Sequence, residues 1–125
     1  MAKILIIEDK KILAEMYQDK FSQAGFEVSL AFNSEEGIRL AKKEKPDLIL
    51  LDILLPKENG IQFLKRLKMV PEISKIPVVA FSNYDEPKTK KEAARLGVKD
   101  YLIKTEFTPA ELVEKIKEYL PSSRI

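Results

Sequence analysis

Asp47-Leu-Ile-Leu-Leu-Asp-Ile-Leu-Leu-Pro-Lys-Glu-Asn-Gly60 is the stretch that decides the fold of this chain. Its apolar run at residues 48–51 is too short for an ordinary helix and is typical of a strand buried on both faces. Asp52 follows at the carboxyl end of this strand, where open parallel sheets bind their ligands. An Asp in this position often only caps the next helix, so a chemical role for Asp52 depends on what the other strands place beside it.

The rest of the chain alternates between strand-like and helix-like patterns. Apolar runs at residues 4–7, 26–31, 78–81 and 101–103 predict four further strands. Helical patterns occupy residues 10–24, 34–45, 60–70, 85–97 and 108–120. We expect helix caps at Asn33 or Ser34, at Asp85, and at Thr108, which opens a capping box with Glu111. The alternation predicts an α/β fold with a parallel sheet covered on both faces, as one domain over residues 1–125 with a short tail at 121–125.

Composition excludes several kinds of chemistry. The 125 residues contain no cysteine and no histidine, which rules out disulfides, thiolate nucleophiles and a phosphohistidine on this chain. The net charge of +2 gives no support for direct nucleic-acid binding. The chain shows neither a signal peptide nor an apolar run that could span a bilayer, so we expect a soluble, cytoplasmic protein without membrane insertion.

Charged and polar side chains follow four of the five expected strands. The first strand is followed by Glu8 and Asp9, the third by Asp52, the fourth by Ser82 and the fifth by Lys104. Three crowded carboxylates repel one another unless a divalent cation lies among them, and oxygen ligands favour Mg²⁺. Aspartate forms acyl phosphates, and an ammonium and a hydroxyl suit phosphoryl oxygens. Each residue alone has an ordinary alternative, such as a helix cap or a surface lysine, so the joint placement is what predicts a phosphorylation site.

This ordered set resembles the receiver domain of two-component response regulators over essentially the whole chain. The matching motifs are Glu8-Asp9, Asp52 with the Leu-Pro-x-x-x-Gly segment that ends at Gly60, Ser82, and Tyr101 three residues before Lys104. The resemblance implies a flavodoxin-like (βα)5 fold with strand order 2-1-3-4-5, similar to the single-domain chemotaxis regulators.

The same resemblance implies a phosphorelay role and assigns the site. Asp52 is the implied phosphoacceptor, Lys104 pairs with the phosphoryl group, and Ser82 and Tyr101 form the switch couple. The implied ligands of Mg²⁺, for which Mn²⁺ can substitute, are Glu8, Asp9, Asp52 and the backbone carbonyl of Leu54. Implied partners are a histidine kinase or phosphotransfer protein, and a downstream protein that binds the face formed by residues 85–97, 101–103 and 108–120. We expect a monomer or a weak phosphorylation-dependent dimer, and no enzymatic turnover beyond the chain's own phosphorylation and dephosphorylation.

Four residues beside the site set this chain apart. Thr105 follows the lysine where many receivers have proline, and Asn83 follows the switch hydroxyl where the family usually has a smaller residue. Leu54 and Tyr84 lie two residues beyond Asp52 and Ser82, at positions that in the family flank the water that hydrolyses the acyl phosphate. An apolar Leu54 and a bulky Tyr84 predict slow hydrolysis.

Two other functions use a similar arrangement. Phosphatases and phosphotransferases of the haloacid dehalogenase class carry a second aspartate as acid/base where this chain has Leu54. A flavin-binding module needs a Ser/Thr/Gly-rich phosphate loop after the first strand, where this chain has Glu8 and Asp9. The cognate kinase, the downstream partner, and whether the chain is complete or part of a longer regulator stay open.

Overall fold

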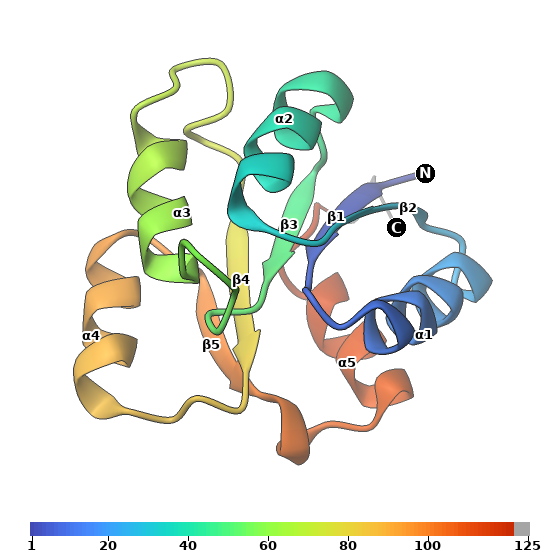
Figure 1. Cartoon of the computed structure of the whole chain (residues 1–125). Coiled ribbons are helices and arrows are strands. Elements are labelled where there is room, and N and C mark those ends of the chain that lie inside the picture. The colour runs from blue at the N-terminus through green and yellow to red at the C-terminus, as the bar shows by residue number, and fades with distance from the viewer. Residues whose placement is uncertain (122–125) are drawn as a thin grey trace.

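Strands and helices alternate five times along the chain (Figure 1). The computed structural model describes residues 1–121, so residues 122–125 of the expected tail lie outside the described part. The elements are β1 (Lys3–Ile7), α1 (Lys11–Gln23), β2 (Glu27–Ala31), α2 (Ser34–Glu44), β3 (Leu48–Leu51), α3 (Gly60–Lys68), β4 (Val78–Ser82), α4 (Pro87–Arg95), β5 (Asp100–Ile103), the 3-10 helix η1 (Lys104–Glu106) and α5 (Pro109–Lys117).

The five strands form one parallel sheet in the order β2-β1-β3-β4-β5, as predicted. Helices α2, α3 and α4 cover one face, and α1 and α5 cover the other (Figure 1). The central strand β3 packs in both directions, because Ile49 and Leu51 join the core under α2 and α3 while Leu48 and Leu50 join the core under α1 and α5. All four side chains are at most 2 % exposed, which explains an apolar run without alternation.

Local signals predicted two of the helix starts correctly. The Asn33 side chain accepts a hydrogen bond from the Glu36 N–H at 2.8 Å, and Thr108 and Glu111 form the expected reciprocal capping box. A capping box at Asn59, which was not anticipated, starts α3 where the loop after β3 ends. These three caps fix where the loops after β2, β3 and β5 end.

Two local features differ from expectation. Asp85 does not cap α4, because the N-cap residue of this helix is Glu86, and Asp85 instead forms an ion pair with Lys90. The single turn η1 directly after β5 was also not predicted. It begins at Lys104 and therefore turns the chain at the residue that the site requires.

Helix α4 buries the fewest residues of the five α-helices in the described part of the chain. Of its residues, all of which the structure describes, only Ala93 is buried, as the thin apolar pattern predicted. By contrast, α3 buries five residues, including Phe63 and Leu64. The free energy that holds α4 against the sheet is correspondingly small.

Candidate functional site

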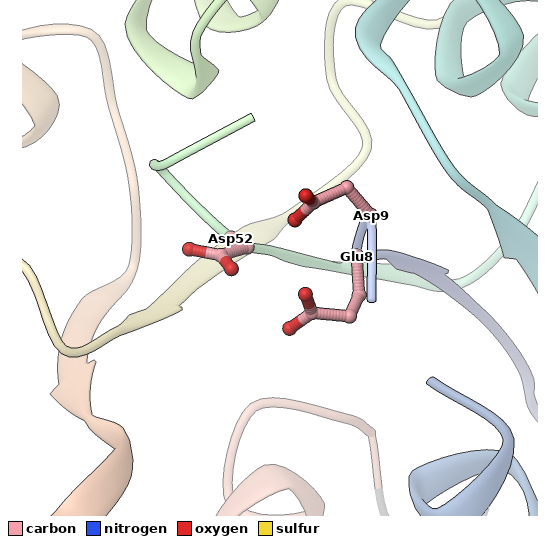
Figure 2. A group of neighbouring side chains, drawn as sticks. All are labelled: Glu8, Asp9 and Asp52. Carbon is pink, nitrogen blue, oxygen red and sulfur yellow. The ribbon is translucent and has the colours of Figure 1, made fainter. Parts of the chain in front are cut away.

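The carboxyl ends of β1 and β3 bring three carboxylates together. Ile7 pairs with Leu51 in the parallel register, so Glu8 and Asp52 follow neighbouring strand ends, and the Asp52 N–H donates to the Ile7 carbonyl at 3.0 Å. Figure 2 shows the side chains of Glu8 and Asp9 extending from the end of β1 toward the side chain of Asp52. One oxygen of each carboxylate lies within 4.8 Å of the others. The expected acidic cluster is therefore present.

Lys104 reaches into this cluster from η1. Its Nζ lies 2.5 Å from Glu8 Oε1 and 2.9 Å from Asp52 Oδ2. The two carboxylates are almost fully buried, at 2 % and 4 % exposure. Burial opposes the charge on Lys104, but the hydrogen bonds to Glu8 and Asp52 outweigh it, so the pKa of Lys104 is raised and the ammonium stays protonated. Burial, reinforced by the charge of Asp52, raises the pKa of Glu8 although Lys104 opposes the shift.

Asp9 is the member of the cluster with spare capacity. Within residues 1–121, its buried Oδ1 atom accepts no hydrogen bond, and Lys10 Nζ forms a long ion pair with it at 3.9 Å. A buried carboxylate oxygen without a hydrogen bond is costly, and a bound cation would satisfy it. The Leu54 N–H donates to Asp52 Oδ1 at 3.1 Å, which keeps the backbone at Leu54 beside the cluster. The donor set of hard oxygens at this sheet edge therefore fits a divalent cation such as Mg²⁺.

Ser82 and Tyr101, the expected switch couple, meet through the backbone of Tyr84. The fully buried Ser82 Oγ accepts a hydrogen bond from the Tyr84 N–H at 3.2 Å, and the Tyr101 hydroxyl donates to the Tyr84 carbonyl at 2.5 Å. Burial, together with the charge of Asp52, raises the pKa of Tyr101 to about 12. The hydroxyl of Tyr101 is therefore protonated at neutral pH and remains a donor to the β4–α4 loop.

The fold and the strand-end residues agree with a comparison against known families. The family model described as the response regulator receiver domain matches residues 4–117. The chain belongs to this family. It is a receiver domain of two-component phosphorelay signalling, as the strand-end residues predicted.

This receiver is similar to three proteins of known class. It is 34 % identical to the alkaline phosphatase synthesis transcriptional regulatory protein PhoP of Bacillus subtilis over 98 % of this chain, and spans 50 % of that protein. It is 33 % identical to sporulation initiation phosphotransferase F of Bacillus subtilis, covering 95 % of this chain and 94 % of that one. The structure of the Vibrio cholerae chemotaxis protein CheY4 superposes with a TM-score of 0.88 at 28 % identity, over 96 % and 99 % of the two chains. The receiver thus spans about half of one relative and nearly all of the other two.

The four residues that were expected to set this receiver apart lie in the segments that directly follow β3, β4 and β5. Leu54 is half exposed, and with Tyr84 it lines a cavity of about 380 Å³ beside α3 and α4. The Tyr84 hydroxyl donates to Glu86 Oε2 at 3.2 Å. Asn83 Oδ1 accepts a hydrogen bond from the Thr105 N–H at 3.1 Å, and the Lys104–Thr105 peptide, like every other peptide in residues 1–121, is trans. The two unusual residues Asn83 and Thr105 are therefore bonded to each other.

Sequence reasoning missed a clamp on the loop that follows Asp52. The buried Ser34 hydroxyl donates to Glu58 Oε1 at 2.5 Å, and Arg66 Nη1 donates to the same oxygen at 2.7 Å. The hydrogen bond from Ser34, with that from Arg66, holds the pKa of Glu58 below its usual range. No local motif predicts this contact, because Ser34 and Glu58 are 24 residues apart. Each is also a common residue type for its position, at a helix start and in a loop.

Among the described residues, every helix is too short or too polar to cross a membrane.

Proposed function

We propose that this receiver accepts a phosphoryl group on Asp52 from a phosphohistidine on a histidine kinase or phosphotransfer protein, in a reaction that requires Mg²⁺. The observation that supports this best is the arrangement around Asp52, whose buried carboxylate accepts a hydrogen bond from the Lys104 ammonium and belongs to the acidic cluster in which Asp9 Oδ1 has no hydrogen-bond partner within residues 1–121. A carboxylate that contacts a fixed cation and shares a metal-compatible group of carboxylates is suited to phosphoryl transfer.

Each side chain around Asp52 has its own role in the proposed phosphoryl transfer. A carboxylate oxygen of Asp52 forms a bond to phosphorus while the phosphorus–nitrogen bond of the donor breaks, and the bonding electrons leave with the imidazole. Lys104 neutralises the phosphoryl oxygens, and the Ser82 hydroxyl donates a hydrogen bond to one of them. Glu8, Asp9, Asp52 and the Leu54 carbonyl would hold the cation. When bound, Mg²⁺ screens the negative charges that oppose the attack.

We further propose that the phosphorylated state is recognised at the face formed by α4, β5 and α5. Tyr101 on β5 and Tyr84 before α4 are hydrogen-bonded to each other, and Tyr84 is bonded to Ser82, so a change at the phosphoryl group reaches this face through three residues. The weak anchoring of α4 by Ala93 favours a shift there. The partner at this face is a downstream protein rather than nucleic acid, and the chain is a monomer or dimerises weakly when phosphorylated.

Turnover of a small phosphorylated substrate is not part of the proposal. The position that would need a proton-transferring carboxylate two residues after Asp52 is Leu54, whose side chain has no titratable group. The chain then catalyses only its own phosphorylation and dephosphorylation.

Labelling of Asp52 tests this function directly. The native chain, incubated with acetyl phosphate and Mg²⁺, should gain one phosphoryl group, located at Asp52 by mass spectrometry after borohydride reduction. Asp52→Asn should abolish labelling, whereas Asp19→Asn on the exposed face of α1 should not change it. Labelling that survives in Asp52→Asn, or that is unaffected by EDTA, would show that the assignment is wrong.

A further inference from the structure

A hydrogen bond joins the two loops that flank the proposed phosphoryl position. Asn83 Oδ1 accepts from the backbone N–H of Thr105 at 3.1 Å, across 22 residues of sequence. Asn83 directly follows Ser82, and Thr105 directly follows Lys104. The bond therefore connects the residues next to the two groups that are to contact the phosphoryl oxygens.

Both partners of this bond depend on the residue type. Only a residue other than proline supplies an N–H at position 105, and only a side chain with an acceptor reaches it from position 83. Asn83 and Thr105 are both exposed, while the neighbouring Ser82 is fully buried and Lys104 is largely buried. The hydrogen bond thus lies on the solvent side of the site and is not part of the hydrophobic core. Its effect is therefore expected on the positions of the adjacent Ser82 and Lys104.

The bond supplements a second connection between the same segments. The Tyr101 hydroxyl donates to the Tyr84 carbonyl, so two consecutive residues of the β4–α4 loop, Asn83 and Tyr84, are held from β5 and from the turn after it. Without the Asn83 bond, Tyr84 would keep the one remaining hydrogen bond between this loop and β5 within residues 1–121, and Lys104 would lose the constraint on the residue that follows it.

We propose that Asn83 and the Thr105 N–H are a pair of positioning groups that hold Ser82 and Lys104 in register across the phosphoryl site. The proposal rests on the phosphorylation of Asp52 proposed above. Because positioning is a large share of phosphoryl-transfer catalysis, losing the pair slows phosphorylation of Asp52. The net contribution of one exposed hydrogen bond corresponds to a rate change of about threefold to fivefold.

A double-mutant cycle separates the hydrogen bond from other effects of substitution. Thr105→Ala keeps the backbone N–H and serves as the reference for Thr105→Pro, which removes it. Each of these two variants is made once with the native Asn83 and once with Asn83→Ala, which gives four chains. The rate of Asp52 phosphorylation by acetyl phosphate with saturating Mg²⁺ is measured for all four. Glu106→Ala, an exposed neighbour in η1, is the control for disturbance of the turn.

The cycle has one supporting result. In the Asn83 chain, Thr105→Pro should react about threefold to fivefold more slowly than Thr105→Ala, and in the Asn83→Ala chain the two should react equally. Equal slowing by proline in both backgrounds would mean that proline acts through the backbone conformation, and the proposal would be wrong. No slowing in either background would also overturn it.

A measurement without phosphorylation keeps the inference separate from the proposed function. Amide exchange at Thr105 should be about threefold to fivefold faster in Asn83→Ala than in the native chain, while exchange at Glu106 should be unchanged. Unchanged exchange at Thr105 would refute the pair even if Asp52 is phosphorylated normally. If exchange responds but native Asp52 cannot be labelled, the hydrogen bond exists and the function proposed for it is wrong.

Discussion

Replacing Leu54 and Tyr84 by polar residues should shorten the lifetime of phosphorylated Asp52. A receiver resets when water attacks the acyl phosphate in line. Leu54 and Tyr84 lie two residues beyond Asp52 and Ser82, at positions that in the family flank this approach. Leu54 offers no hydrogen bond to water, and the Tyr84 hydroxyl is already bonded to Glu86. Neither residue therefore orients the attacking water, so the native acyl phosphate should be longer-lived than that of fast-resetting chemotaxis-type receivers.

The size of the effect follows from the hydrogen bonds that the substitutions would add. Leu54→Asn supplies an amide at the rim of the site, and Tyr84→Glu supplies a carboxylate in place of the ring. Each new hydrogen bond to the attacking water contributes about 1 kcal/mol. Two of them lower the barrier by about 2 kcal/mol, which is roughly a thirtyfold faster hydrolysis, because 1.36 kcal/mol is a factor of ten.

The assay is the decay of phosphorylated Asp52 after rapid removal of the phosphodonor, with Mg²⁺ kept constant. The double variant should decay roughly thirtyfold faster than the native chain. Tyr84→Phe is the matched control, because it keeps the ring and removes only the hydroxyl that Glu86 already holds, and its decay should be unchanged. If the double variant decays at the native rate, these side chains do not control the lifetime.

Three further predictions test other parts of the molecule. Asp9→Ala should weaken Mg²⁺ binding by about tenfold or more, measured by calorimetry, and an unchanged affinity would exclude Asp9 as a ligand. Amide exchange at residues 85–97 should change when a phosphoryl mimic and Mg²⁺ are added, whereas a response confined to α2 would contradict the proposed route. Glu58→Gln should lower the free energy of unfolding by about 1 kcal/mol at pH 7, after allowance for solvent exposure. Because the folded-state pKa of Glu58 lies below its unfolded value of 4.5, this loss should disappear as the pH falls through the folded pKa, and a pH-independent loss in urea titrations would argue against the ionic contact.

The sheet was predictable because most strands are apolar runs, and four of the five are followed by a charged or polar residue. The apolar run from Leu48 to Leu51 requires a strand that is buried on both faces of the sheet. Such a strand places Asp52 at the sheet edge where Glu8 follows β1. Neither conclusion requires knowledge of which side chains touch. Periodicity and the geometry of parallel sheets are sufficient.

The pairing of side chains within the site was less predictable. Sequence spacing could not indicate that Lys104 donates hydrogen bonds to both Glu8 and Asp52. It also could not indicate the hydrogen bond between Asn83 and Thr105, since these contacts depend on loop conformation. The predicted cap at Asp85 was wrong by one residue. Helix α4 begins at Pro87, so Glu86 is its N-cap, and Asp85 instead pairs with Lys90.

The weak hold on α4 has a consequence for signalling in the absence of a phosphodonor. A helix that buries only Ala93 in the part of the chain described has little apolar area to lose when it moves. If the displaced position lies about 2 kcal/mol above the resting one, about 3 % of unphosphorylated molecules occupy it at any time. A partner that binds this position tightly would then draw an output from the unmodified receiver, at a level set by the partner's concentration. The basal activity of the pathway would therefore depend on how strongly one helix is packed, independently of the chemistry at Asp52.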